Sequence, residues 1–350
     1  MRILVIGGTG FVGAQVIEQL QKPGHSILVI HRNPTQEEPQ PEVQHLLTDR
    51  ARLPEFRQVF QQFAPEVVLD MIPYTELDAR IVMETFHGIA QRVVAISSGD
   101  VSRAYGRLIG TEPGPIEPVP LTEETPLREK LYPYRGETLR SKNDPMRWMD
   151  DYDKIVVERI FMSDPMLPGT ILRLPMMYGP RDKQHRLFEY LKRMDDQRLA
   201  IILGEAYARW RWPRGYVTNA AAAIVLAITN GRATGRIYTV GDEPAFTIQE
   251  WVQAIGKVAG WQGTIVSLPE ERLPERLVVK LNTNQDLFFD TTRIRQELGY
   301  REMVSLDEAL KHTIAWQRAN PPTDIDAHLF DYTLEDVVLA ELQEKPETTS

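Results

Sequence analysis

The chain of 350 residues contains no cysteine. Disulfide bonds, thiolate ligands for a metal ion and a cysteine nucleophile are therefore excluded. The absence fits a reducing compartment such as the cytosol, and no metal site is predicted.

Long apolar runs are also missing. No stretch reaches the roughly 18 consecutive apolar residues that a membrane-spanning helix needs. The N-terminal run "ILVIGG" is too short for the apolar core of a signal peptide. We therefore expect a cytoplasmic protein with no membrane partner.

Positive charge is in deficit, because 40 lysines and arginines face 49 aspartates and glutamates, giving a formal net charge of -9. Nucleic acids are bound by basic fields, so this balance argues against nucleic acid as the main partner. It does not exclude a local basic patch, and the expected partner is a small-molecule substrate. Hydrophobic residues make up 42% of the chain, enough to bury a sizeable core.

Short apolar runs recur along the chain, and most are nearly continuous Val, Ile and Leu, as in strands buried on both faces. They lie at residues 2–7, 26–32, 43–47, 66–72, 92–98, 169–175 and 236–241. Segments with helical spacing separate them, which predicts a parallel sheet. We expect an α/β fold: a Rossmann-type doubly wound parallel sheet of about seven strands, with a smaller, mostly helical C-terminal substrate domain.

The domain boundaries are predicted from the same runs. Residues 112–150 are rich in proline and charge, so we expect a long loop there, in one interpretation a lid. The expected units are residues 1–175 with about 213–241 for the sheet domain, 176–212 and 242–320 for the substrate domain, and 321–350 for an acidic, frayed tail.

A glycine-rich turn, "GGTGFVG", joins the first strand directly to a helical pattern. Glycines here permit a tight turn, let the backbone approach a pyrophosphate, and let the helix pack closely on the sheet. The helix N-terminus adds N–H donors for the phosphates. This context makes dinucleotide binding a strong prediction. The expected contacts are Gly7, Gly10, Phe11, Val12 and Gly13.

The ends of the second and third strands bear on which dinucleotide is bound. NAD-binding sites carry an Asp or Glu after the second strand to bond the ribose hydroxyls. This chain has His31 in that place, followed by Arg32. Because an arginine can pair with a 2′-phosphate, NADP is slightly favoured over NAD. Asp49 is a predicted contact to the adenine amino group.

Further motifs follow the glycine turn in a characteristic order: "SSGDV", "LTEETPL", "KIVVE", "LRLPMMYGPRD", "RGYV", "YTVGDEPAFTIQEW" and "FDTTRIRQELGY". With them the chain resembles the extended short-chain dehydrogenases/reductases, in an atypical form, and in particular the NAD-dependent epimerase/dehydratase family that acts on nucleotide sugars. The resemblance implies hydride transfer with NADP or NAD on a sugar or nucleotide sugar. A homodimer is the usual assembly in that family.

The resemblance also implies roles for catalytic residues. Ser98 matches the serine or threonine that bonds the substrate oxygen. Lys154 matches the lysine that holds the nicotinamide ribose and lowers the pKa of a catalytic tyrosine. Asp100 matches an acidic position of the family's dehydratases, although an aspartate in a turn after a strand is common for structural reasons.

Binding residues are implied in the same way. Pro175 and Tyr178 lie where the chain passes the nicotinamide, with a packing role as the alternative for both. Arg214 matches an arginine that contacts the substrate diphosphate. The family's second diphosphate arginine, expected before "FDTTRIR", is absent, which leaves room for another substrate. Asp70 ends a buried strand, so it needs a partner.

The catalytic motif Tyr-x-x-x-Lys is broken, because Asp150 stands where the tyrosine should be. In one interpretation Tyr152 swings into the site. In another, Tyr134 or Tyr132 from the long loop supplies the phenol. In the third no tyrosine is used, and Asp150 serves as base or the usual chemistry is lost.

The leading hypothesis is an NAD(P)-dependent epimerase/dehydratase-like enzyme, with Ser98, Lys154 and provisionally Tyr152 in catalytic roles. The alternatives are an NAD(P)-binding regulatory or partner-binding protein with little turnover, and an NADPH-dependent reductase of a non-sugar carbonyl. RNA binding is opposed by the acidic charge balance.

Overall fold

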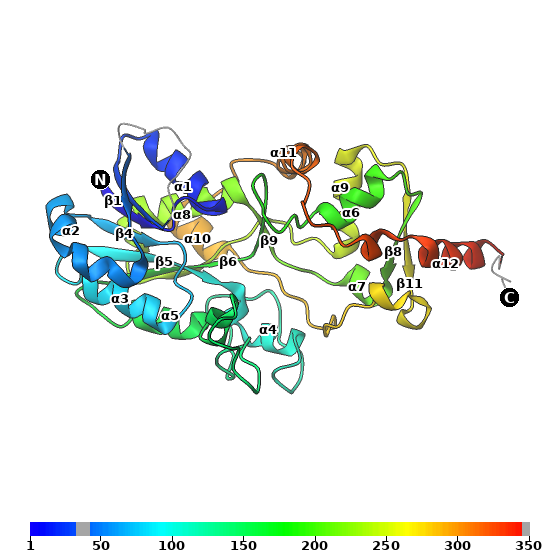
Figure 1. Ribbon diagram of the computed structural model, residues 1–350, viewed down its shortest axis with the longest axis horizontal. Coiled ribbons are helices and arrows are strands. Elements are labelled where there is room, and N and C mark those ends of the chain that lie inside the picture. The colour runs from blue at the N-terminus through cyan, green and yellow to red at the C-terminus, as the bar shows by residue number, and fades with distance from the viewer. Residues whose placement is uncertain (33–42, 345–350) are drawn as a thin grey trace.

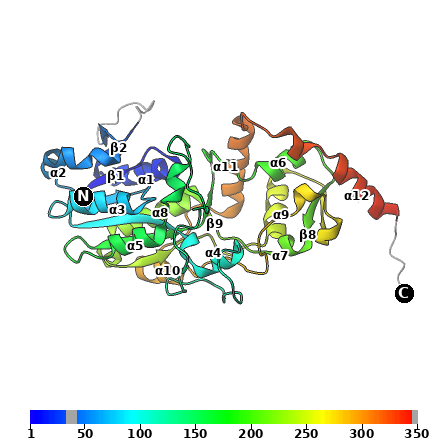
Figure 2. The same ribbon diagram turned by 60° about the horizontal axis from the view of Figure 1, so that its bottom comes forward.

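The computed structural model describes residues 1–32 and 43–344 of the chain. Two lobes follow one another along the long axis of the molecule, with the N-terminus in one and helix α12 (Thr333–Glu344) at the far end of the other (Figure 1). A second view separates the same two lobes (Figure 2).

The first lobe is built on a sheet with the strand order β10-β6-β5-β4-β1-β2-β3, in which all neighbours are parallel. This confirms the predicted doubly wound fold, and all seven apolar runs are strands. Their bounds are β1 Arg2–Ile6, β2 Ser26–His31, β3 Val43–Leu47, β4 Val67–Asp70, β5 Arg92–Ser98, β6 Gly169–Leu174 and β10 Ile237–Thr239.

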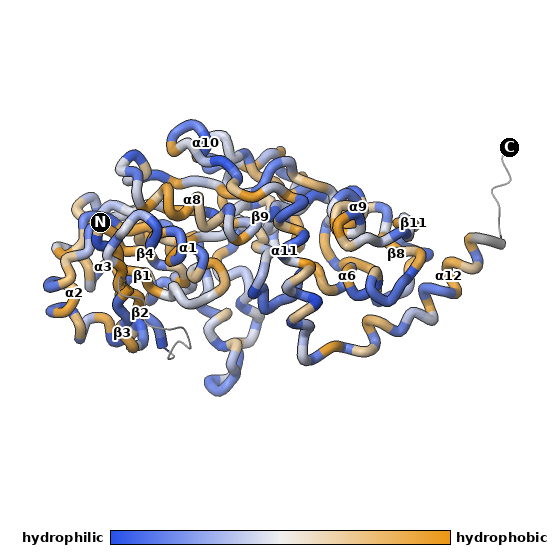
Figure 3. The backbone as a smooth tube through the Cα atoms, turned by 90° about the horizontal axis from the view of Figure 1, so that it is seen from above, coloured by the Kyte–Doolittle hydropathy of each residue, from blue (hydrophilic) through white to orange (hydrophobic). Residues whose placement is uncertain are grey.

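Helices cover both faces of this sheet because its strands bury side chains on both sides. Ile3 and Val5 pack towards one set of helices, and Leu4 and Ile6 towards the other. The first set is α1 (Phe11–Gln21), α8 (Val217–Thr229) and α10 (Thr292–Leu298); the second is α2 (Arg57–Phe63), α3 (Glu76–Phe86) and α5 (Lys154–Phe161). The alanines of α8 allow close packing on α1, and α8 is largely orange in the hydropathy view (Figure 3).

The second lobe is mostly helical, as predicted for the substrate domain. It contains α6 (Phe188–Asp195), α7 (Glu205–Arg209), α9 (Ile248–Ala259) and α11 (Leu306–Ala319), beside the parallel pair β8 (Ala200–Gly204) and β11 (Thr264–Leu268). A short parallel pair, β7 (Met176–Tyr178) and β9 (Arg214–Tyr216), follows the sheet strand β6. Helix α4 (Arg103–Leu108) packs through Ala104 and Leu108 on the hydrophobic core that α6, α9 and α11 share.

Two predicted boundaries differ from the structure. Helix α10 lies inside the stretch assigned to the substrate domain, yet Ile294 and Leu298 belong to the core beneath α1 and α8. The predicted tail forms the 3-10 helix Ala327–Phe330 and then α12. It is anchored by the buried Glu335, which pairs with Arg193.

The long loop at residues 112–150 is confirmed, with a single short 3-10 helix, η3 (Arg147–Asp150), before α5. It is firmly packed, because Glu112, Glu117 and Arg128 are buried within it. The Nε of Arg128 donates to the carbonyl oxygen of Asp100 at 2.5 Å, which ties the loop to the end of β5. Among the described residues, none of the helices has the length and apolar composition to span a membrane.

Candidate functional site

The glycine turn has the geometry that the sequence predicts for binding phosphates. Gly7 adopts φ +82°, a conformation that favours glycine, and its N–H donates to Ile30. A Cβ on Gly13 would lie 2.7 Å from the carbonyl oxygen of Gly8, so α1 packs too closely for a side chain. A Cβ on Gly10 would meet nothing nearer than 3.9 Å. The turn is therefore closed on the protein side and open where a ligand approaches the N-terminus of α1.

A cleft of about 530 Å³ opens beside this turn. It runs past the ends of β1, β2 and β4 at the carboxyl edge of the sheet, where such folds bind ligands. Its lining includes Gly7, Thr9, Gly10, Arg32, Asp49, Tyr74 and Trp148. The exposed Arg32 and Asp49 thus lie where the sequence places them, and these residues fit the phosphate and adenosine half of a dinucleotide.

Asp70 has the partner that its burial demands. Two nitrogens of Arg50 donate to its carboxylate, Nη1 at 2.5 Å and Nη2 at 2.7 Å. The same Nη2 reaches the carbonyl oxygen of Ile72 at 3.1 Å. Arg50 also lines the cleft, so this pair fixes the strand ends beneath it. Asp70 is itself fully buried and acts structurally.

The predicted catalytic residues converge where β5 ends and α5 begins. The phenol of Tyr152 donates to Oδ2 of Asp100 at 2.7 Å, and the N–H of Asp100 donates to Oγ of Ser98 at 3.2 Å. The ammonium of Lys154 donates to the carbonyl oxygens of Pro73 and Ile96, at 2.8 and 2.9 Å. Asp100, Tyr152 and Lys154 are buried, and Ser98 is half-buried.

The electrostatics of this cluster differ from those the resemblance implies. Burial raises the pKa of Tyr152 well above its ordinary value, and the neighbouring charge of Asp100 raises it further. Burial also raises the pKa of Asp100, against the hydrogen bond from Tyr152. The pKa of Lys154 is lowered to about 8 by burial, although Asp100 opposes the change. The pKa of this tyrosine is thus raised by its burial and then by the carboxylate that it faces, where the resemblance implies a lowered pKa.

A second tyrosine from the long loop reaches the same carboxylate. The hydroxyl of Tyr134 donates to Oδ2 of Asp100 at 3.3 Å and lies 3.0 Å from the hydroxyl of Tyr105. Tyr152 and Tyr134, which the sequence offers as alternative sources of the phenol, therefore both donate to the carboxylate of Asp100. Tyr132 packs elsewhere, with its ring under the guanidinium of Arg135 at 3.9 Å.

Asp150 is held in ion pairs within the long loop and does not join the catalytic cluster. It is fully buried in η3, where its Oδ2 accepts from the N–H of Arg140 at 2.7 Å. Guanidinium groups of Arg140 and Arg147 pair with the same carboxylate. Burial alone would raise its pKa, but the bonds from Arg140 lower it below the ordinary value. The carboxylate is committed to holding the loop, which contradicts its interpretation as a base.

Arg214 lies in the second predicted binding region and is almost entirely buried. Its Nη1 donates to the carbonyl oxygens of Trp212 and Phe246, at 3.2 and 3.3 Å, and its guanidinium lies 4.5 Å from the ring centre of Trp251. Its Nε has no partner within the described chain. Burial lowers its pKa to about 10. A buried guanidinium with an unpaired Nε suits an anionic ligand.

Arg214 lines a small cavity of about 130 Å³ together with Tyr178 and Asp242. The hydroxyl of Tyr178 donates to Asp242 at 3.2 Å, so this residue borders the cavity while also packing the core. Pro175 packs against β9, where a Cβ on Gly215 would meet its ring at 2.9 Å. This contact fits the packing role for Pro175.

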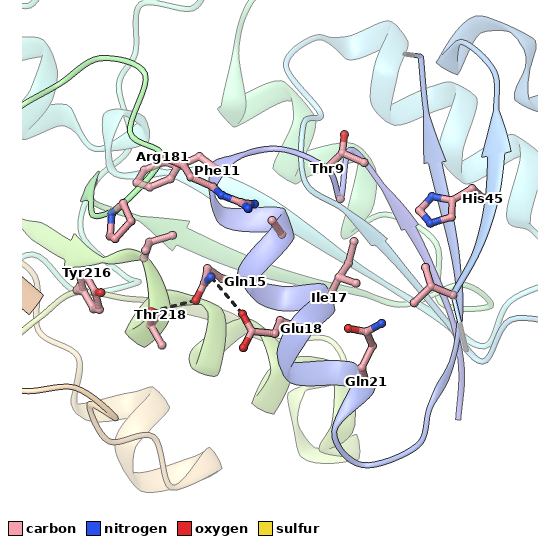
Figure 4. Close-up of a pocket in the computed structure, with 15 residues that line it drawn as sticks. Thr9, Phe11, Gln15, Ile17, Glu18, Gln21, His45, Arg181, Tyr216 and Thr218 are labelled. Atoms are coloured by element: carbon pink, nitrogen blue, oxygen red, sulfur yellow. Dashed lines mark hydrogen bonds between the residues drawn. The ribbon is translucent and has the colours of Figure 1, made fainter. Parts of the chain in front are cut away.

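A further cleft of about 560 Å³ lies along the outer side of α1 (Figure 4). Gln15 bonds Thr218 and Glu18 across its floor, and Arg181 stands at its rim (Figure 4). Its polar groups come from the glycine turn, α1, β3, the segment after β7 and the start of α8, and the predicted catalytic residues are not among those that line it.

Comparison with known sequences decides the family. The sequence model of the "NAD dependent epimerase/dehydratase family" matches residues 3–241. The chain belongs to this family. The predicted family and its class of enzymes are thereby confirmed, and the family's dependence on NAD agrees with the glycine turn.

Individual relatives are distant. The chain is 24% identical over 340 residues to a UDP-N-acetyl-alpha-D-glucosaminuronate decarboxylase of Bacillus cytotoxicus, covering 91% of this chain and 98% of that protein. It is 25% identical over 189 residues to the uncharacterized protein y4nL of Sinorhizobium fredii, covering 47% of this chain and 52% of that protein, about half its length.

Solved structures share the fold. A UDP-glucose 4-epimerase of Thermotoga maritima, with UDP-glucose, superposes with TM-score 0.64 at 19% identity, covering 91% of this chain and 99% of the other. A UDP-glucuronic acid 4-epimerase of Bacillus cereus, in complex with UDP-glucuronic acid and NAD, gives TM-score 0.64 at 17% identity, with coverage of 91% and 99%.

Sequence reasoning missed the two large aromatic residues of the cleft, Tyr74 and Trp148. Tyr74 follows β4 and Trp148 lies in η3, so no shared motif links them. The sequence did carry one signal for Trp148: a large aromatic residue stands in a proline-rich, charged loop, where no apolar pattern predicts that it packs in a core.

Proposed function

We propose that this chain is an NAD(P)-dependent enzyme that removes hydride from a hydroxyl-bearing carbon of a nucleotide sugar, or delivers hydride to a carbonyl carbon of one. One observation carries the proposal: the phenol of Tyr152 and the carboxylate of Asp100 share a 2.7 Å hydrogen bond at the carboxyl edge of the sheet. Family membership and relatives named as nucleotide-sugar enzymes support it.

When bound, the dinucleotide supplies or accepts the hydride. The glycine turn and the N-terminus of α1 hold its phosphates. Ser98 orients the substrate oxygen by a hydrogen bond. As the substrate hydroxyl gives its proton to the oxygen of Tyr152, the phenol proton of Tyr152 passes to Oδ2 of Asp100. The raised pKa of Asp100 suits this residue to hold that proton.

Lys154 has an electrostatic part in this scheme. Its buried ammonium lies 4.9 Å from the ring centre of Tyr74 and 6.0 Å from that of Tyr152. A cation at this position stabilises the negative charge that the phenol–carboxylate pair carries before the substrate proton arrives. Arg214, with its unpaired Nε, is the group proposed for the substrate diphosphate.

The decisive experiment compares Asp100→Asn and Tyr152→Phe with the wild type on a panel of UDP- and dTDP-linked sugars. Loss of general acid–base catalysis should lower kcat by about 100-fold or more, with cofactor affinity retained. Tyr132→Phe is the matched control, because that ring packs under Arg135. Wild-type turnover in both test variants would refute the assignment.

For the cofactor we propose a preference for NADP through Arg32, which is exposed at the cleft where NAD-binding sites carry a carboxylate. Arg32→Ala should weaken NADPH binding by about tenfold, the equivalent of one charge-assisted hydrogen bond, and leave NADH binding unchanged. Equal losses for both cofactors would contradict the preference.

A second function, cofactor binding with little turnover, is favoured by the burial of the cluster. Lys154 is 3% exposed and its ammonium bonds two backbone carbonyl oxygens. Stoichiometric binding of NAD(P) without hydride exchange on any sugar of the panel would support this function over the first.

A further inference from the structure

Two large aromatic side chains stand open in the cleft beside the glycine turn. Tyr74 is 38% exposed and Trp148 is 41% exposed. Their rings are stacked, with centres 5.0 Å apart and planes inclined by 29°. Aromatic side chains of this size are usually buried, so an exposed stacked pair in a cleft indicates a surface for another flat ring.

The backbone that carries both rings is held in place by hydrogen bonds and ion pairs. The N–H of Tyr74 donates to Asp78 at 3.0 Å, and its carbonyl oxygen accepts from the N–H of Asp153 at 3.1 Å. Trp148 sits in η3, whose last residue, Asp150, is pinned by Arg147. A rigid aromatic surface binds a flat ring with less loss of conformational entropy than a mobile one.

The position of the pair within the cleft indicates which ring it receives. Arg32 and Asp49 mark the adenosine end, beyond the glycine turn. Tyr74 and Trp148 lie near the catalytic cluster, because their ring centres are 6.0 and 6.1 Å from that of Tyr152. A dinucleotide with its phosphates at the glycine turn and its adenine near Asp49 directs its other ring to this end.

We propose that Tyr74 and Trp148 form an aromatic wall that holds the nicotinamide ring of the bound cofactor. This inference rests on the proposed function. Trp148 comes from the long loop, so the loop that carries the broken motif also supplies part of the cofactor site. The wall is a positioning element, since it sets the place of the ring relative to Tyr152 and Asp100.

The test uses the intrinsic fluorescence of the full chain, which has 6 tryptophans. The wild type, Trp148→Phe and Trp148→Ala are titrated with NAD, NADP and ADP-ribose, which lacks the nicotinamide. We expect both dinucleotides to quench the wild type, most of this quenching to vanish in Trp148→Phe, and ADP-ribose to leave the emission of Trp148 unchanged. Trp148→Ala should weaken dinucleotide binding by about tenfold, as for loss of one stacking contact, and Trp148→Phe by less.

Trp316→Phe is the matched control, because Trp316 stacks on His185 in the second lobe. It should keep the wild-type quenching by dinucleotides. Dinucleotide binding with the same quenching in Trp148→Phe as in the wild type would overturn the wall alone. Equal quenching of Trp148 by ADP-ribose would overturn its assignment to nicotinamide. Failure of both dinucleotides to bind the wild type would overturn the wall and the proposed function together.

Discussion

At the scale of single residues, Lys154 shows how burial changes chemistry. Its ammonium is buried, and two backbone carbonyl oxygens replace the water that it has lost. Burial disfavours the charged form, so the pKa falls from 10.5 to about 8. The folded protein therefore carries a cation that it releases more readily than the unfolded chain does.

This difference predicts a pH dependence of stability. Between about pH 8 and pH 10.5 the unfolded chain keeps the Lys154 proton while the folded protein has lost it. The unfolded state then binds more protons, so stability rises with pH. Relative to Lys154→Met, the wild-type free energy of unfolding should increase by about 1.4 kcal/mol per pH unit within this window. Urea unfolding of both proteins checks this, and a constant or falling difference would contradict it.

The family resemblance placed Ser98, Asp100 and Lys154 in one site, and the structure brings these residues together where β5 ends and α5 begins. The raised pKa of Tyr152 could not be predicted, because it depends first on the burial of the phenol and then on the carboxylate that faces it. Tyr152 and Asp100 are 52 residues apart, and no local pattern encodes their contact. The pairing of Asp70 with Arg50 was foreseen only as a need for some partner.

At the scale of elements, the start of α5 explains the broken motif. A tyrosine four residues before the lysine can share a helix face with it only when both lie in one helix. Here α5 begins at Lys154, and Asp153 caps it by accepting from the N–H of Ile155 at 2.8 Å. Position 150 lies in η3 instead. Tyr152 reaches the site because the irregular turn between the two helices redirects it.

Restoring the motif by Asp150→Tyr should therefore fail to raise turnover. The substitution removes the buried partner of Arg140 and Arg147, at a cost of about 3 kcal/mol or more in the free energy of unfolding. Urea unfolding and kcat measure the two effects, with Asp150→Asn as the control that keeps the size of the side chain. A gain in turnover over the wild type would show that position 150 can enter the site.

Strands were easier to predict than the connections between them. The sheet buries both faces, so its strands are marked by continuous apolar runs, such as "ILVI" of β1. The long loop owes its order to buried charged groups, among them Arg128 and Glu117, and charged residues in a sequence suggest exposure. Helix α12 was not predicted for the same reason. Its acidic residues suggest a solvent-exposed tail, yet one of them, Glu335, is buried and pairs with Arg193.

At the scale of the whole molecule, neither lobe is a continuous stretch of chain. The first sheet takes β10 from beyond β8, and its helical cover takes α10 from beyond β11. The make-up of each lobe therefore depends on where the chain crosses back to the first lobe. The periodicity of apolar residues does not reveal these crossings. The predicted division returned the chain to the first lobe at about 213–241 and assigned α10 to the second lobe, whereas Ile294 and Leu298 of α10 pack in the core of the first.

Helix α12 should stabilise only the second lobe. Oε1 of Glu335 accepts from Arg193 at 3.1 Å and from Arg276 at 2.9 Å. Glu335→Gln removes the buried charge and should lower the free energy of unfolding of this lobe by about 3 kcal/mol. Cofactor affinity should not change, because the glycine turn lies in the first lobe.

The neighbouring Asp336 provides the control for this prediction. It pairs with Arg198 while 57% exposed, so Asp336→Asn should cost less than about 1 kcal/mol. Urea unfolding of both variants, with cofactor titration in parallel, makes the comparison. Equal losses of unfolding free energy in the two variants would contradict the role given to Glu335. A loss of cofactor affinity in Glu335→Gln would contradict the expectation that α12 stabilises the second lobe alone.

Strand β1 and helix α12 lie in different lobes, towards opposite ends of the long axis (Figure 1). The distance between them therefore reports how far apart the two lobes are. A donor dye near the first and an acceptor near the second would report the separation of the lobes by energy transfer. A ligand that contacts only the glycine turn should leave the signal unchanged. One that also draws in the second lobe should brighten the acceptor, and this would distinguish a bare cofactor from a complete substrate complex.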